Sequence, residues 1–193
     1  MRILEDNALG PAFRYNDGHV YAVLDCLMHE DHASRMRLTE VTGLGEGSVR
    51  SLIRVLRKWE LVDTARRGTS INDTGRKVYS QFRMKLVDCR CDAYATGNCQ
   101  CGVIVGGIAR LVEDGLCQRD VAVRNGAEGA SVFVMRGGRV VFPRDTVVDD
   151  DYPDFVRSLR AAGLSEGDAY ILVGADTEAA ARCAAAATGV ALL

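Results

Sequence analysis

Four cysteines that lie close together in the sequence have the residue type and the spacing of a metal or redox site. Cys89 and Cys91 form one C-x-C pair, and Cys99 and Cys101 form a second. Residues i and i+2 of a β-strand share a face, so a hairpin that pairs Cys89 with Cys101 and Cys91 with Cys99 would place four sulfurs in one patch. Opposite Cβ atoms in such a hairpin lie about 4.5–5.5 Å apart. The spacing permits a metal site, cross-strand disulfides or a patch of small core side chains.

These three alternatives predict different chemistry. Thiolates favour soft and borderline ions, so a metal site would hold zinc or an iron–sulfur cluster and would make the protein a metal or redox sensor. Disulfides would make a thiol switch, although a reducing cytosol disfavours stable bridges. Cysteines that only fill a sheet face would have neither role. The C-x-C spacing is less common than C-x2-C in structural zinc sites, and the sequence leaves the cofactor unknown.

A second set of residues with chemical potential is a stripe of arginines on a helix predicted over residues 46–59. At 100° per residue the apolar side chains of this segment fall on one face, and Arg50, Arg54 and Arg57 fall on the opposite face. The guanidinium fork matches phosphate oxygens and the O6/N7 edge of guanine. The stripe therefore predicts a DNA-reading helix, with use of the same face for a protein partner as the alternative.

The residues around this stripe fit the same interpretation. Small side chains at the start of the helix would let its N-terminus approach DNA, where free N–H groups bind phosphate. Two further arginines occupy the tip of a predicted hairpin, a position suited to backbone or minor-groove contacts. The predicted DNA-contacting residues are Gly47, Ser48, Arg50, Ser51, Arg54, Arg57, Lys58, Arg66 and Arg67.

Charge is distributed unevenly along the 193 residues. The whole chain has a formal net charge of −2, but residues 34–87 hold twelve Lys and Arg against five Asp and Glu. Residues 1–33 and 88–193 are both acidic, with net charges of −4 and −5. A basic segment between acidic flanks is typical of a nucleic-acid site confined to one module.

The expected elements give an α+β fold in two parts. Residues 1–86 have the order of a winged helix-turn-helix domain: helices over 19–30, 34–43 and 46–59, strands over 61–65 and 69–71, and a helix from 73 that continues toward 86. Residues 87–193 predict a small α/β-type sandwich domain with a mixed or antiparallel sheet, for effector binding or dimerisation. Its strands are expected at 87–92, 99–106, 131–136, 139–142 and 169–173, and its helices at 116–125, 152–162 and 177–187.

Several stretches resemble known families. Residues 38–50 resemble the helix-turn-helix of archaeal and bacterial winged-helix transcription regulators, and residues 61–62, 66–68 and 71–76 continue the resemblance. The whole chain is similar to archaeal proteins that join such a domain to an archaeal domain of unknown function, on residues 118–127, 129–131 and 141–143. The first resemblance implies DNA binding, whereas the second implies no established chemistry. Those regulators usually have Gly where this chain has Glu60, so the third helix is expected to end differently.

Other groups of polar residues give weaker signals. Cys26, His29 and His32 sit at a helix end with poorly convergent spacing, and Asp149–Asp151 with Asp154 are expected to form a loop and a helix cap. The glycines at 102, 106 and 107 lack the full dinucleotide-binding pattern. No nucleophile, base and acid set stands out, so the protein is not expected to be an enzyme.

These observations predict a DNA-binding transcriptional regulator. The expected partners are double-stranded DNA, a second copy of the chain and an unidentified small-molecule or metal effector, with no membrane. Val78, Phe82 and Leu86 form a stripe that could hold the second copy. A cytoplasmic location is expected, because the sequence has no long apolar run and an acidic start. The alternative function is an enzyme for a small metabolite fused to a winged helix.

Overall fold

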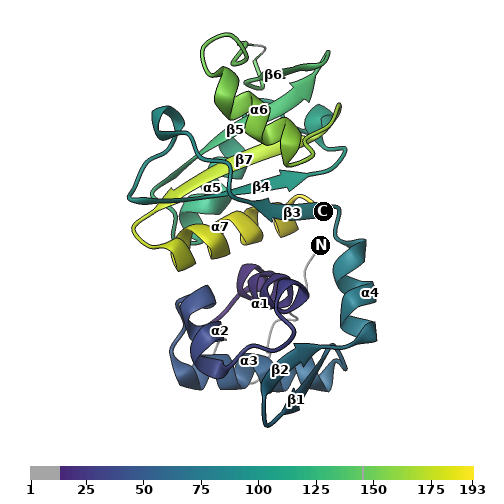
Figure 1. Ribbon diagram of the computed structural model, residues 1–193. Helices are drawn as coiled ribbons and strands as arrows, with labels where there is room; N and C mark the ends of the chain where they lie inside the picture. Colours follow the sequence, from purple (N-terminus) through teal and green to yellow (C-terminus); the bar gives the residue numbers. More distant parts are fainter. Residues whose placement is uncertain (1–13, 145) are drawn as a thin grey trace.

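The structure is a computed structural model that describes residues 14–144 and 146–193. Its first half consists mainly of helices. Its elements are α1 (Asp17–His29), α2 (Arg35–Thr42), α3 (Glu46–Lys58), the antiparallel hairpin β1 (Val62–Ala65) and β2 (Gly68–Ile71), and α4 (Asp73–Gln81). Figure 1 shows α1, α2 and α3 grouped together, with the hairpin beside α3. Each predicted element of this half is present, within one or two residues at most ends.

Local polar caps fix where these helices begin. The side chains of Asn16, Ser34 and Asn72 accept hydrogen bonds from backbone N–H groups in the first turns of α1, α2 and α4. Such caps satisfy N–H groups that have no partner within the helix. Helix α2 ends as predicted at Gly43, whose φ of 69° is left-handed. The buried apolar faces of the three first helices then form one core.

The end of α3 differs from the expectation. Glu60 adopts the left-handed conformation, with φ of 58°, and the N–H of Leu61 donates to the carbonyl of Leu56 at 3.0 Å. The helix therefore ends in the conformation that glycine usually supplies, although the chain has glutamate there. A non-glycine residue in this region costs on the order of 1 kcal/mol, which the surrounding contacts offset.

The second half is built on a five-stranded antiparallel sheet. Its strand order is β3-β4-β7-β5-β6, and all neighbouring strands are antiparallel. The strands are β3 (Met84–Val87), β4 (Cys99–Val105), β5 (Gly129–Arg136), β6 (Arg139–Val141) and β7 (Ala169–Ala175). Short 3-10 turns cover Asp92–Tyr94 and Ala109–Leu111. Of the two predicted sheet types, the antiparallel one is confirmed.

Helices cover both faces of this sheet. Helices α5 (Leu116–Arg124) and α7 (Glu178–Ala191) lie on one face and α6 (Pro153–Ala161) on the other, as Figure 1 shows. Two separate apolar clusters fill the layers. The predicted hairpin at residues 136–139 is also present, because Gly137 and Gly138 have φ of 60° and 74° and Arg136 pairs with Arg139. Positive φ at both central residues is the type I′ turn that matches strand twist.

The join between the two halves is not helical, so that prediction is wrong. Helix α4 ends at Gln81 and β3 begins at Met84. The aromatic ring of Phe82 packs edge-on against Tyr21 with centroids 5.3 Å apart, and this contact turns the chain into the sheet. Leu86 packs against the apolar cluster between the sheet and α7, and Val78 packs against this cluster and the core of the first half. The predicted dimer stripe is therefore used inside the chain.

Helix α7 connects the two halves through direct packing. It lies between the sheet and α1 (Figure 1). A Cβ at Gly18 of α1 would collide with the carbonyl of Cys183, so only glycine permits this approach. The Cys183 Sγ also lies 3.6 Å from the carbonyl oxygen of Thr42, at the end of α2. Displacement of α7 would therefore disturb α1 and α2.

Among the described helices, none combines the length and the apolar composition that a membrane span needs.

Candidate functional site

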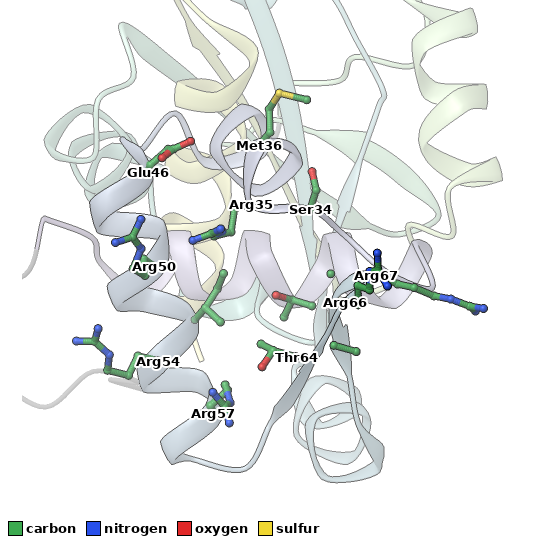
Figure 2. Close-up of a pocket in the computed structure, with 14 residues that line it drawn as sticks. Ser34, Arg35, Met36, Glu46, Arg50, Arg54, Arg57, Thr64, Arg66 and Arg67 are labelled. Atoms are coloured by element: carbon green, nitrogen blue, oxygen red, sulfur yellow. The ribbon is translucent and has the colours of Figure 1, made fainter.

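A groove of about 710 Å³ lies between α2, α3 and the β1–β2 hairpin. Figure 2 shows Arg50, Arg54 and Arg57 on α3, with Arg66 and Arg67 across the groove at the hairpin turn. Of the residues that the structure describes, six arginines and one acidic residue line it. The lining residues are Ser34, Arg35, Met36, Glu46, Arg50, Ile53, Arg54, Arg57, Thr64, Ala65, Arg66, Arg67, Gly68 and Thr69.

The packing of α3 explains why its arginines lie in the groove. Val49, Leu52, Ile53 and Leu56 are buried in the core of the first half, which fixes the rotation of the helix. The charged side chains on the opposite face are then exposed. A helical period of 3.6 residues places positions 50, 54 and 57 on one stripe. The apolar pattern of α3 therefore sets the direction of its basic stripe.

A backbone bridge positions the hairpin against α2. The N–H of Ala33 donates to the carbonyl of Thr69 at 2.8 Å, and the N–H of Thr69 donates back at 2.9 Å. Gly68, with φ of 132°, lies so close to Ala33 that a Cβ there would meet its carbonyl. This contact brings Arg35, the first residue of α2, to the same groove as the arginines at the hairpin turn.

The groove arginines differ from many others in the chain because no carboxylate neutralises them. No ion pair involves any of the six within residues 14–144 and 146–193. By contrast, Arg37 on α2 lies outside the groove and pairs with Glu30 at 2.8 Å and with Glu40 at 3.5 Å. Six unneutralised guanidinium groups around one depression attract anions and repel one another. Their fork geometry suits phosphate and carboxylate oxygens in particular.

Comparison with known proteins identifies the second half. Residues 96–192 match the model of the Domain of unknown function family DUF4443. The chain belongs to the DUF4443 family. The predicted resemblance to a domain of unknown function is thereby confirmed. The DUF4443 match includes β4, β5, β6 and β7 but neither the groove nor β3.

Solved structures add a likeness in fold. The chain is similar to the hypothetical protein PH0730 from the archaeon Pyrococcus horikoshii OT3, with 23% sequence identity and a TM-score of 0.77. The similarity covers 93% of each chain, so it includes the part outside the DUF4443 match. At this identity it shows the fold alone. No match was found among curated proteins.

The groove gathers most of the predicted basic residues but not all the predicted positions. Five of the nine line it, namely Arg50, Arg54, Arg57, Arg66 and Arg67. The other four, Gly47, Ser48, Ser51 and Lys58, do not line the groove. The hydroxyl of Ser51 lies 3.4 Å from that of Tyr15, on another side of α3. Contact of any of the nine with DNA stays a prediction.

Arg35 is the residue that sequence reasoning missed. Its position directly after the Ser34 cap could be read from the sequence, because Ser34 is a typical residue to precede a helix. The missing information was the bridge between Ala33 and Thr69, which joins residues 36 positions apart. Patterns of neighbouring residues in the sequence do not predict such a bridge.

The four predicted metal ligands do not meet, so the predicted hairpin register is wrong. Strand β3 ends at Val87 opposite Gly102, whereas β4 continues along β7 with Cys99 opposite Ala175 and Cys101 opposite Val173. Cys89 and Cys91 follow β3 outside any strand and lie in the core on the α6 side. Cys101 packs on the α7 side of the sheet. The four sulfurs are therefore on different sides of the DUF4443 sheet.

The surroundings of these cysteines favour a packing role. Burial raises the pKa of Cys89, Cys91 and Cys101, the last to about 12. The thiols stay protonated at neutral pH, whereas metal binding and nucleophilic attack need the thiolate. All four predicted ligands are free thiols. In the described parts of the chain, no cluster of three or more His, Cys, Asp or Glu residues is arranged to hold a metal.

Two of the weaker signals also have structural partners in the DUF4443 half. Asp149 accepts from the backbone N–H of Val140 at 2.7 Å and from Arg160 at 2.9 Å, so it joins β6 to α6. The N–H of Gly107 donates to the carboxylate of Asp168 at 2.9 Å. The backbone N–H of Gly107 is therefore already bonded to a carboxylate of the chain.

Proposed function

We propose that this protein is a DNA-binding transcriptional regulator whose first half is a winged helix-turn-helix domain. The observation that carries the proposal is the groove, in which six arginines without carboxylate partners surround a single acidic residue. The order of α1, α2, α3 and the β1–β2 hairpin supports it, because the short Gly43-Leu44-Gly45 turn joins α2 to α3 in the manner of a helix-turn-helix.

In this proposal α3 enters the major groove of DNA. A helix of 13 residues is about 20 Å long, enough to follow the groove over several base pairs. Arg50, Arg54 and Arg57 would reach base edges and phosphates, because a guanidinium can bond guanine O6 and N7 together. Arg66 and Arg67 at the turn of the hairpin would contact the neighbouring backbone or minor groove. Arg35 at the start of α2 would bind a phosphate between them.

The second half would supply the response to an effector or the contact between two subunits. DNA-binding helix-turn-helix proteins commonly read two half-sites as two-fold dimers, and we include a homodimer in the proposal. The stripe of Val78, Phe82 and Leu86 is a poor candidate for its surface, because Phe82 is buried and the half-buried Val78 and Leu86 already pack against the cores of the chain. Sedimentation at micromolar concentration would test the dimer, and a monomer with DNA present would remove it from the proposal.

The test of DNA binding uses two double variants with the same change in charge. Arg50→Ala/Arg54→Ala removes two groove arginines, and Arg119→Ala/Arg124→Ala removes two exposed arginines of α5 outside the groove. Binding to fragmented genomic DNA is measured by fluorescence anisotropy at about 50 mM salt, where phosphate contacts are strongest.

We expect the groove variant to lose at least about 30-fold in affinity, since each specific arginine contact contributes about 1–3 kcal/mol. The α5 variant should lose less than about 3-fold from the general change in charge. Equal affinities of the two variants would contradict the DNA-binding assignment.

A further inference from the structure

A second cavity, of about 420 Å³, lies where the two halves meet. Its walls come from α1, the end of β3 and the residues after it, β4 and the first turns of α7. The residues that matter here are Asp25, Asp88, Arg90, Cys101, Glu178 and Arg182. Its volume is in the range of small-molecule sites, at the small end of that range. The cavity is separate from the arginine-lined groove and shares no residue with it.

Charges of both signs face this cavity, and one pair of them is incompletely bonded. The Nη1 of Arg182 lies 3.8 Å from Oδ2 of Asp25, which is too far for a hydrogen bond. The side chain of Arg182 donates no hydrogen bond to any other part of the described chain. Asp25 is only 6% exposed, and its Oδ1 accepts a hydrogen bond from the hydroxyl of Tyr79 at 2.6 Å. Its Oδ2 and the guanidinium fork therefore keep bonding capacity at the cavity wall.

The rest of the wall adds two carboxylates, Asp88 and Glu178, and one guanidinium, Arg90, together with the side chains of His29 and Gln100. Glu178 is exposed on the first turn of α7, one helical turn before Arg182. Arg90 is held beside Asp88 at 2.6 Å. Cys101 also lines the cavity, but burial raises the pKa of its thiol to about 12, so it is not a nucleophile at neutral pH. The charged groups of both signs make the wall suited to binding a charged ligand.

We propose that this junction cavity binds a small zwitterion of the L-α-amino acid class. The carboxylate of the ligand would bond the fork of Arg182, with Arg90 nearby, and its ammonium group would lie between Asp25 and Glu178. A ligand with both charges satisfies the separated pair without leaving a buried charge unmatched, whereas a simple anion or cation would satisfy only one side. Leu86 and Val87 provide an apolar section of wall for the ligand side chain.

Because α7 contacts the turn before α3, binding of such a ligand could change the position of α3. This step rests on the proposed function. Cys183, next to Arg182, contacts the carbonyl of Thr42 at 3.6 Å, and Ala179 lies close to Gly43. Thr42 and Gly43 end α2 and lead into the turn before α3. A ligand that draws Arg182 away from Asp25 would shift α7 against this turn and so change the orientation of the DNA-reading helix.

The binding test uses the full chain and the twenty L-α-amino acids, each alone at about 5 mM. Thermal unfolding is compared with that in the matching amines, which lack the carboxylate, and the matching carboxylic acids, which lack the ammonium group. At a concentration 100-fold above Kd, a ligand of the native state raises Tm of a protein of this size by about 5–10 °C. We expect one amino acid, or a few of similar side chain, to give such a rise and their one-charge analogues to give less than a quarter of it.

Two variants locate the site. Arg182→Met should abolish the rise in Tm, and Glu178→Gln, which leaves the buried Asp25 and its neighbours intact, should reduce the affinity at least about 5-fold by calorimetry. Arg119→Met on α5 is the control and should keep the full rise. No rise with any amino acid, an equal rise with one-charge analogues, or an unchanged response in Glu178→Gln would each overturn the proposal.

A DNA-binding measurement with the active amino acid separates this proposal from the proposed function. A change of at least about 5-fold in DNA affinity supports the coupling. Unchanged DNA affinity overturns the coupling but keeps the binding site. A rise in Tm in a protein that binds no DNA overturns the proposed function and again keeps the site.

Discussion

Three arginines of the DUF4443 half stand in surroundings opposite to those of the groove arginines. In the second half, Arg139 pairs with Asp150 at 2.8 Å, Arg157 with Asp154 at 2.6 Å and Arg160 with Asp149 at 2.9 Å. In the groove, six arginines lie around one depression, and Glu46 is the only acid among the described residues that line it. The first group is neutralised by the chain itself. The second group remains available to an anion from outside.

The two groups of arginines therefore differ in their effect on the stability of the fold and on the binding of anions. A surface ion pair contributes about 0–1 kcal/mol to stability, so each paired arginine stabilises the fold by a small amount. Like charges gathered without partners destabilise the folded state through their repulsion. Binding of a polyanion in the groove would offset the repulsion between these arginines. The comparison therefore predicts that groove variants change binding and that variants of the paired arginines change stability.

The largest expected effect comes from two arginines of the same helix. Arg35 lines the groove without a partner, whereas Arg37 pairs with Glu30 and Glu40. We expect Arg35→Ala to weaken DNA binding about 5–150-fold, the equivalent of about 1–3 kcal/mol. Arg37→Ala, with the same change in charge, should weaken it less than about 2-fold. Anisotropy at one salt concentration measures both, and equal losses would mean that ion pairing does not distinguish the two residues.

The hairpin arginines should alter the salt dependence of binding. If Arg66 and Arg67 each contact a phosphate, Arg66→Ala/Arg67→Ala lowers the slope of log K against log salt by about 2. The loss should be similar for specific and unrelated DNA sequences, because phosphate contacts hold no sequence information. The measurement is a titration series between about 50 and 200 mM salt. A slope equal to that of the unmodified protein would exclude the hairpin from the interface.

A paired arginine should show the reverse pattern. Arg160 bonds Asp149, whose side chain is 17% exposed, and also donates to the carbonyl of Gly138 at 2.9 Å. We expect Arg160→Ala to lower the free energy of unfolding by about 1 kcal/mol and to leave DNA affinity within about 2-fold. Urea unfolding and anisotropy of the same preparation measure both. Loss of DNA affinity without loss of stability would place Arg160 with the groove arginines instead.

Much of the fold could be predicted from the sequence because its signals are local. Caps at Ser34 and Asn72, the glycine pair at the β5–β6 turn and the apolar period of α3 each act within a few residues. The basic stripe followed from that same period. The resemblance of residues 118–143 to a domain of unknown function was confirmed by the DUF4443 match.

The features that sequence reasoning missed all depend on contacts between distant residues. The register of the cysteine segment is decided by β7, which takes the far edge of β4, and by the hydroxyl of Tyr170, which donates to the carbonyl of Cys89. The turn from α4 into β3 depends on packing of Phe82 against Tyr21. Glu60 adopts its left-handed conformation where the next residue, Leu61, donates to the carbonyl of Leu56 and accepts from the N–H of Asn72 after β2. Neither the cysteine spacing nor the apolar stripe of α4 contains this information.

The smallest expected effect concerns Glu46, the acidic residue in the described lining of the groove. Glu46 lies on the first turn of α3, where its charge favours the helix, but it faces the same depression as the six arginines. Glu46→Gln should lower the free energy of unfolding by about 0.3–1 kcal/mol. It should also strengthen DNA binding about 2-fold at low salt, because one charge about 10 Å from a phosphate contributes about 0.4 kcal/mol in water. Glu40→Gln, outside the groove and paired with Arg37 at 3.5 Å, is the control and should leave DNA affinity unchanged. The opposite signs of the two changes in Glu46→Gln distinguish an electrostatic effect at the interface from a general loss of structure, which would weaken both stability and binding.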